Sequence, residues 1–343
     1  MVAFVTAPQP ALVEGHTRRH RQLRGRALAA GCSSHTAAEH ASSGTHPRGA
    51  ALSRRAAVTL STAAAAAAVV SRRQWSTART EPLADTVPAT AVAADAPAVF
   101  YVRPGPDDAA SNTFGAVADA VAAAPAGSTV RIAPGGYYGE RLILTRPIVL
   151  EVEPGGGAVT LTHDTEFPYE ATVQVECTGV TLRGLQVRHS SPSIAGNYAV
   201  LVRSAGGLTL ERCDVSSTTG SGLGVEGGTA TAVQCRFTNC RRHGAALYGD
   251  LMGAVAGTTV LEDCTITANR EEGVILRDGA DASLLGCKIT QNGGIGILAV
   301  DSSLALVGCE VRSNKRGSLK VERSRELKYE ATILDAPPAL IEA

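Results

Sequence analysis

The sequence predicts an all-β protein, a single-stranded right-handed parallel β-helix of about eight coils with a short capping helix at its N-terminal end. Three observations carry this prediction: a repeat of nearly constant period, short β-branched segments within each repeat, and polar corner residues at fixed places between them. The chain has 343 residues, zero formal net charge, 36 glycines and few aromatic residues. This composition favours a turn-rich β stack over a helical bundle and gives no reason to expect a nucleic-acid partner.

Residues 1–80 have the composition of an organelle targeting segment, which is excluded from the fold. They contain eleven arginines, no lysine and only two acidic residues. "SRRQWSTA" (71–78) is typical of a mitochondrial cleavage site, whereas "SRRAAVTLSTAAAAAAVV" (53–70) is typical of a twin-arginine signal for a thylakoid lumen. We expect a mitochondrial protein, with the chloroplast as the alternative. The apolar run of this segment is shorter than the ~18–20 residues that a membrane span needs, and we also expect no membrane span in the mature chain.

The remaining chain divides into three parts. Residues 81–98 are a Pro/Ala/Thr linker, residues 99–325 form the predicted β-helix, and residues 326–343 are expected to form a C-terminal cap or tail. Residues 113–124 are amphipathic and predict a helix that covers the open end of the first coil, which otherwise exposes apolar core and strand edges. One face of that helix is apolar: Phe114, Val117, Ala118 and Val121.

Five cysteines mark the repeat: Cys213, Cys235, Cys264, Cys287 and Cys309. Their sequence numbers differ by 22, 29, 23 and 22, and the long interval contains an insertion, "LYGDLMGAVAG" (247–257). A polar residue follows each cysteine and an apolar residue comes next, so the cysteine and that apolar residue face inward by the strand's period of two. A period near 22 in short β segments indicates a solenoid with one coil per repeat.

The corners of the coils are predicted from asparagine and glycine. Asn269, Asn292 and Asn314 each lie five residues after a cysteine, and Asn239 lies four residues after its own. Asparagine tolerates the left-handed corner conformation, and its amide can stack in a ladder that satisfies backbone groups. Glycines follow at nearly the same period and give room to the next corner: Gly222, Gly244, Gly273, Gly296 and Gly317.

The cysteines do not predict a metal site or a disulfide framework. A metal site needs local pairs such as Cys-x-x-Cys, and no histidine accompanies the one close pair, Cys235 and Cys240, at ligand spacing. Cysteines stacked one per coil lie ~4.8 Å apart with parallel side chains, which is poor disulfide geometry. We expect buried free thiols that pack as small apolar residues, and neither a metal nor a cofactor.

The segment 114–156 and the coils that follow it resemble the parallel β-helix repeats of the pectin-lyase-like superfamily. The matching residues of the opening module are Pro134, Gly135, Tyr138, Glu140, Arg146, Pro147 and Ile148. The resemblance is closest to the carbohydrate-binding and sugar-hydrolase group of β-helix proteins, and it covers about residues 98–325. It implies the fold, which supports several chemistries and does not by itself assign one.

No known catalytic motif of that superfamily is present, so the catalytic residues are unassigned. The sequence lacks the paired aspartates of polygalacturonases, the Asp-Pro-His motif of epimerases and a counterpart of the methylesterase acids. The acids near the repeat are scattered among arginines, which favours a solvated, salt-bridged face: Glu211, Asp214, Glu262, Asp263, Arg212 and Arg236.

Two insertions interrupt the repeat, at residues 188–198 and 241–253, and loops added to a rigid solenoid are where binding usually resides. Their polar and aromatic residues are the candidate ligand-binding residues: Arg188, His189, Tyr198, His243, Tyr248 and Asp250. We expect a non-catalytic binding or scaffold protein of an organelle, with a protein or glycan partner. The alternative is a carbohydrate-active enzyme, a lyase, hydrolase or epimerase, which requires these side chains to converge in one groove.

Overall fold

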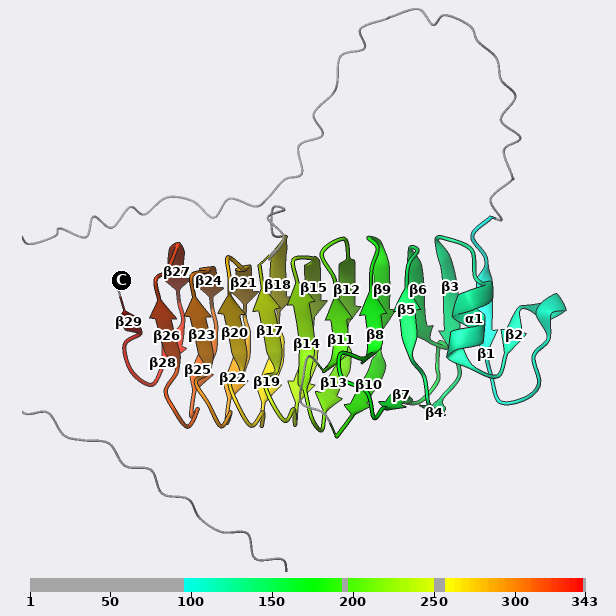
Figure 1. The fold of residues 1–343 in the computed structure, drawn as a ribbon, viewed down its shortest axis with the longest axis horizontal. Helices are drawn as coiled ribbons and strands as arrows, with labels where there is room; N and C mark the ends of the chain where they lie inside the picture. The colour runs from blue at the N-terminus through cyan, green and yellow to red at the C-terminus, as the bar shows by residue number, and fades with distance from the viewer. Residues whose placement is uncertain (1–95, 193–196, 250–256, 342–343) are drawn as a thin grey trace, which may run out of the picture. The chain divides into compact units, whose positions relative to one another are not determined.

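The computed structural model describes residues 96–192, 197–249 and 257–341. The expected targeting segment, most of the linker and Asp250 lie outside these ranges. Within them the chain forms three long parallel sheets, here called A, B and C, and each coil contributes one strand to each sheet in turn (Figure 1). The described residues make nine coils, numbered 1 to 9 from β3–β4–β5 to β27–β28–β29.

The strands are short, with two to six residues each. Sheet A runs through β2 (Thr113–Phe114), β1 (Val99–Val102), β3 (Ser128–Ile132), β6 (Ile148–Val152), β9 (Val180–Arg183), β12 (Gly207–Glu211), β15 (Thr229–Val233), β18 (Thr258–Glu262), β21 (Asp281–Leu285), β24 (Ser303–Val307) and β27 (Glu326–Glu330). Sheet B runs through β4 (Gly135–Tyr138), β7 (Val159–Asp164), β10 (Leu185–Ser190), β13 (Asp214–Ser217), β16 (Arg236–Thr238), β19 (Thr265–Thr267), β22 (Lys288–Thr290), β25 (Glu310–Arg312) and β28 (Ile333–Leu334). Sheet C runs through β5 (Leu142–Leu144), β8 (Ala171–Val175), β11 (Tyr198–Val202), β14 (Ser221–Glu226), β17 (Ala245–Tyr248), β20 (Val274–Arg277), β23 (Ile297–Val300), β26 (Leu319–Glu322) and β29 (Ala339–Ile341).

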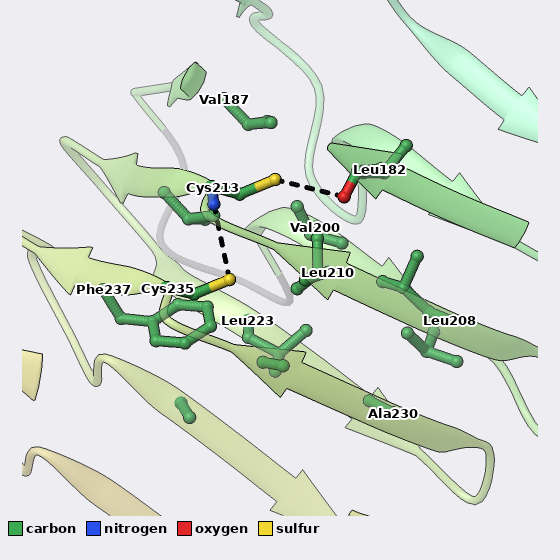
Figure 2. Close-up of a cluster of buried hydrophobic side chains, with 14 of the residues drawn as sticks. Leu182, Val187, Val200, Leu208, Leu210, Cys213, Leu223, Ala230, Cys235 and Phe237 are labelled. Atoms are coloured by element: carbon green, nitrogen blue, oxygen red, sulfur yellow. Dashed lines mark hydrogen bonds between the residues drawn. The ribbon is translucent and has the colours of Figure 1, made fainter. Parts of the chain in front are cut away.

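The core is a column of inward-facing side chains from all three sheets. Alternate residues of strands such as β3 and β12 in sheet A are buried, as the period of two requires, whereas β11 and β14 in sheet C bury consecutive residues. The five cysteines of the repeat are free and at most 1% exposed, which confirms the prediction. Figure 2 shows Cys213 and Cys235 stacked beside Phe237, with the Cys213 amide donating to the Cys235 sulfur at 3.4 Å. The Cys213 thiol donates to the carbonyl of Leu182 in the preceding coil at 3.4 Å. The cysteine sulfurs therefore also bond backbone groups at the A–B corner, which is the turn from sheet A to sheet B; the turn from sheet B to sheet C is likewise called the B–C corner.

The predicted asparagine ladder is present at the corners between sheets B and C. Asn292 Oδ1 accepts from Asn269 N at 3.1 Å and from Asn269 Nδ2 at 3.0 Å. Asn292 Nδ2 donates to Ile266 O at 3.1 Å and to Asn314 Oδ1 at 2.9 Å. One part of the prediction was wrong, because the left-handed residue is the one before each ladder asparagine: Ala268, Gln291 and Ser313. Asn239, one place earlier in its repeat, adopts that conformation itself, with φ of 57°.

The glycines beside this ladder are needed for space. A Cβ on Gly273 would lie 2.6 Å from Ile289 Cγ2 and 2.8 Å from Asn292 Nδ2. Gly244 and Gly296 face the same conflict with Asn269 and Asn314. The repeat of Asn and Gly is therefore one packing unit, in which each glycine lets the next strand approach a buried amide.

The capping helix is α1 (Val117–Ala123), and it covers the N-terminal end of the coils beside β1 and β2 (Figure 1). It begins later than residue 113, because Thr113 and Phe114 pair with β1 as a short strand; a 3-10 turn (Ala109–Ser111) precedes them. Glu140, 5% exposed, accepts from Val117 N at 2.8 Å and Ala118 N at 3.0 Å. The Arg146 guanidinium donates to Ala124 O at 2.7 Å and to two further carbonyls of the last turn. Two residues of the opening module therefore hold the helix at both ends.

The C-terminal segment that was expected to be a cap or tail adds a further coil, β27–β28–β29, in register with coil 8. No helix in the described part of the chain is long and apolar enough to cross a membrane.

Candidate functional site

Arg188 lies on the outer face of sheet B and is engaged within that sheet. Its Nη1 lies 3.1 Å from Asp214 Oδ1 and 2.9 Å from Ser216 Oγ, both on the next coil. Acids and arginines also alternate on the outer face of sheet A, where Arg183 lies 3.6 Å from Glu151 and 3.0 Å from Glu211. Glu211 and Asp214 therefore belong to salt-bridged outer faces, as predicted.

His189 is the next residue on β10, and it points into the coil. Its side chain is 1% exposed, and its Nδ1 lies 3.0 Å from Ser217 Oγ. The ring centroid is 6.4 Å from that of His163 on the preceding coil. Burial lowers the pKa of His189 to about 4, and the neighbouring His163 adds to this effect, so the imidazole is neutral at physiological pH. His189 thus acts as an interior polar residue of coil 3.

Tyr198 and Tyr248 lie on the outer side of sheet C. The Tyr198 ring packs over Gly224, where an added Cβ would lie 2.4 Å from the ring, and its hydroxyl donates to Glu226 Oε1 at 3.2 Å. Burial raises the pKa of both tyrosines. Tyr198 belongs to a small apolar cluster outside the main core: Ala171, Tyr198, Leu201, Ala246 and Ile275. A ring this buried serves packing and does not offer a free face to a ligand.

His243 lies at the B–C corner of coil 5, beside two glutamates of coil 6. Its Nε2 is 3.3 Å from Glu271 Oε2 and its Nδ1 is 3.0 Å from Glu272 Oε2. The His243 contact lowers the pKa of Glu272. Arg242 Nε lies 3.3 Å from the same Glu271 oxygen. Among the described residues, this is the one group of three or more His, Cys, Asp or Glu residues whose ligand atoms all lie within 4.8 Å of one another.

The predicted site residues therefore form two groups. Arg242 and His243 both contact the same Glu271 oxygen, and the charge of Arg242 opposes the effect of burial on the pKa of Tyr198 and of Tyr248. Arg188 and His189 contact residues of coils 2 and 4 instead. Asp250 is outside the described residues. Among the described residues, no hydrogen bond or ion pair joins Arg188 or His189 to His243.

Three exposed aromatic residues were missed. Tyr138, Phe167 and Tyr169 are 81%, 68% and 64% exposed, and they lie on β4 and in the B–C corner of coil 2. We call these three residues the aromatic platform. Tyr329, on coil 9, is the other strongly exposed aromatic residue among the described ones. A usable signal was present, because "DTEFPYE" (164–170) places two aromatics between strands in a chain with few of them.

The corner that carries Phe167 and Tyr169 is held by a partly buried polar network. Glu170 accepts from the Thr165 hydroxyl and lies 3.2 Å from His163 Nε2 and 3.2 Å from Arg141 Nη1. The hydrogen bond from Thr165 is the main cause that lowers the pKa of Glu170, so this carboxylate is ionised. Thr165 Oγ1 also accepts from Phe167 N at 3.1 Å. Phe167 and Tyr169 thus lie in a hydrogen-bonded corner, whereas Tyr138 lies on β4.

Comparisons with known proteins agree with this architecture. A family model described as a right handed beta helix region matches residues 171–333. A rhamnogalacturonan lyase structure is similar over 65% of this chain and 69% of that chain, with a TM-score of 0.53 and 14% identity. A pectin methylesterase from Erwinia chrysanthemi is similar over 71% of this chain and 92% of that chain, with a TM-score of 0.49 and 13% identity. No curated protein matches the sequence. The chain therefore has a right-handed parallel β-helix fold, which it shares with the rhamnogalacturonan lyase structure.

Proposed function

We propose that the protein is a non-catalytic binding module that recognises a neutral glycan through the aromatic platform. The observation that carries this proposal is the exposure of Tyr138, Phe167 and Tyr169 on adjoining parts of coils 1 and 2. Sugar rings present apolar faces that pack on aromatic rings, and a site with a few fixed polar groups beside such rings gives orientation.

The rigidity of the aromatic platform supports a role in ligand binding, as opposed to aromatic residues that are exposed without a role. Arg141 of coil 1 and Glu170 of coil 2 are ion-paired at 3.2 Å, which ties the two corners together. Aromatic residues on fixed backbone lose little conformational freedom when a ligand binds, so more of the contact energy remains as affinity.

The charge around the platform favours a neutral glycan. Asp164, Glu166 and Glu170 lie within three residues of Phe167 in the sequence, and Arg141 is already paired with Glu170. An anionic polyuronate would meet like charge there, which weakens its binding relative to an uncharged polymer.

The second candidate function is a carbohydrate-active enzyme, and His243 with Glu271 and Glu272 favours it. An imidazole beside two carboxylates is a combination used in general acid–base catalysis. This cluster lies three coils from the platform, so the two candidates use different parts of the surface.

Affinity gel electrophoresis of the full chain tests the proposal. Gels that contain neutral polysaccharides should retard the protein, and gels that contain polygalacturonate should not. Phe167→Ala and Tyr169→Ala should abolish the retardation, while Tyr329→Ala, a matched exposed aromatic on coil 9, should leave it unchanged. Release of new reducing ends or of unsaturated uronates from any of these polymers would instead establish the enzyme.

An organelle location remains part of this proposal. Its support is the arginine-rich, acid-poor composition of residues 1–80. N-terminal sequencing of the native protein tests it: a start at Ser76 supports mitochondrial processing, and a start just after Ala78 supports lumenal processing. An intact Met1 on the native protein would remove both assignments.

A further inference from the structure

The B–C corners of coils 5 and 6 bring one buried imidazole and two carboxylates to one place. His243 is 4% exposed, Glu272 is 14% exposed and Glu271 is 44% exposed at the side chain. The ligand atoms that these three residues offer lie within 4.8 Å of one another. The sequence did not reveal this group, because Glu271 and Glu272 follow His243 only after a whole coil and its insertion.

The imidazole of His243 has a buried nitrogen that makes no hydrogen bond. Nδ1 lies only 3.0 Å from Glu272 Oε2, yet the oxygen is off the axis along which that nitrogen would donate. A metal ion accounts for this geometry. In a metal site the nitrogen lone pair points at the ion, and two ligand atoms at about 2.1 Å from it lie about 3.0 to 3.4 Å apart.

We propose that His243, Glu271 and Glu272 bind a divalent transition-metal ion. The ion takes Nδ1 of His243 and the Glu272 carboxylate as its nearest ligands, and Glu271, which lies 3.3 Å from the other ring nitrogen, completes the site after its side chain rotates. This donor set suits Zn²⁺, with water in the remaining positions. Ca²⁺ and Mg²⁺ prefer sites made of oxygen alone, so they should bind more weakly.

The backbone around the three ligands is fixed without the ion. Arg270 N donates to Cys240 O at 2.9 Å, and Glu271 N donates to Arg242 O at 3.1 Å. Asn269, the first member of the ladder, accepts from Cys240 N at 3.0 Å. These bonds hold the two corners in register on both sides of the ligands, so ion binding requires only side-chain adjustment.

Arg242 sets the expected strength of the site. Its Nε lies 3.3 Å from the Glu271 oxygen and competes with an ion for that carboxylate. His243 and Glu272 therefore form the firmer pair, and Glu271 is the exchangeable ligand. Arg242→Ala should tighten binding several-fold, whereas loss of His243 or Glu272 should weaken it at least tenfold.

The test is titration of the chelator-treated full chain with Zn²⁺ by calorimetry, with Mn²⁺, Ca²⁺ and Mg²⁺ as comparisons. The chain has eight histidines, so other sites contribute heat, and the informative quantity is the difference between variants. His243→Ala and Glu272→Gln should each remove one binding event. His163→Ala, which removes the other buried His–Glu contact, should retain it. Circular dichroism of each variant separates loss of binding from loss of fold.

Two results would overturn the assignment. Equal Zn²⁺ affinity and stoichiometry in the wild type, His243→Ala and Glu272→Gln would show that the three residues bind no ion. Nitrogen NMR spectra in which His243 carries protons on both ring nitrogens, with and without Zn²⁺, would show instead an imidazolium held between two carboxylates. A zinc-dependent shift of the His243 nitrogens that Glu272→Gln abolishes is the expected result.

Discussion

The polar groups at the B–C corners have different partners in two parts of the solenoid, coils 6 to 8 and coils 1 to 3. In coils 6 to 8 each corner has six residues, one left-handed residue other than glycine and one ladder asparagine. In coils 1 to 3 the corners differ in length, and their polar side chains have individual partners: Glu140 accepts from amides of α1, and Glu170 accepts from the Thr165 hydroxyl. The corners of coils 6 to 8, here called the regular region, are alike because one repeated side chain bonds the backbone groups of each corner. The corners of coils 1 to 3, here called the irregular region, each have their own polar contacts, and this variation leaves room for exposed aromatic residues.

The largest expected effect comes from breaking the regular region at its centre. Asn292→Ala removes the partners of Asn269 N and Ile266 O, both buried. At about 1–3 kcal/mol for each unsatisfied buried group, the free energy of unfolding should fall by about 4 kcal/mol. Denaturant unfolding of the variant and the wild type measures this difference in unfolding free energy.

Asn239→Gly is the matched control for this variant. Asn239 is exposed and left-handed, and glycine adopts that conformation without strain. The change in unfolding free energy should stay within about 1 kcal/mol. Equal losses in the two variants would mean that the ladder contributes nothing beyond a corner conformation.

The irregular region should be the acid-sensitive one. The pKa of His189 is lowered from 6.5 to about 4 in the folded chain, so the unfolded chain binds an extra proton between these values. The stability from this group is fully present above pH 6.5 and is lost as pH falls toward 4. It should account for about 2 kcal/mol of unfolding free energy between pH 7 and pH 5. His189→Gln should flatten the pH dependence by that amount, and an unchanged slope would rule out a neutral buried His189.

A smaller, local effect is expected at the N-terminal end. Glu140→Gln keeps the shape but removes the charge that accepts from Val117 N and Ala118 N. The unfolding free energy should fall by about 1–2 kcal/mol, and hydrogen exchange should accelerate in α1 before it does in coils 6 to 8. Asp119→Asn, which alters an exposed acid in the same turn, is the control. Uniform acceleration along the solenoid would show that the cap is not a separate unit.

The regular region was predictable from sequence, and the irregular one was not. The spacing of Cys287, Asn292 and Gly296 predicted a coil because all three residues pack against equivalents one repeat away. His189 was read as a loop residue, although it continues the inward row of β10. Its partners His163 and Ser217 come from neighbouring coils whose corner lengths differ, so no spacing rule could bring them together.

Unequal corner lengths also explain why the sequence did not reveal the surface groups, the aromatic platform and the partners of His243. Tyr138 was noted only as part of the opening module, and the pairing of its strand β4 with β7, which leads into the corner of Phe167 and Tyr169, was not predicted. His243 was singled out from its insertion, but Glu271 and Glu272 lie one coil later and were invisible as partners. Sequence periodicity predicts the stack of coils. Contacts between side chains of coils with unequal corners are seen only in the three-dimensional structure.

The most direct test of this account is glycan binding by platform variants of unchanged stability. Tyr138→Ala, Phe167→Ala and Tyr169→Ala remove exposed rings, so unfolding free energies should change by no more than about 0.5 kcal/mol. Calorimetric titration with a neutral oligosaccharide that retards the wild type should show at least tenfold weaker binding in each variant and unchanged binding in Tyr329→Ala. Wild-type affinity in all three platform variants would contradict the account and would place any glycan site elsewhere on the solenoid.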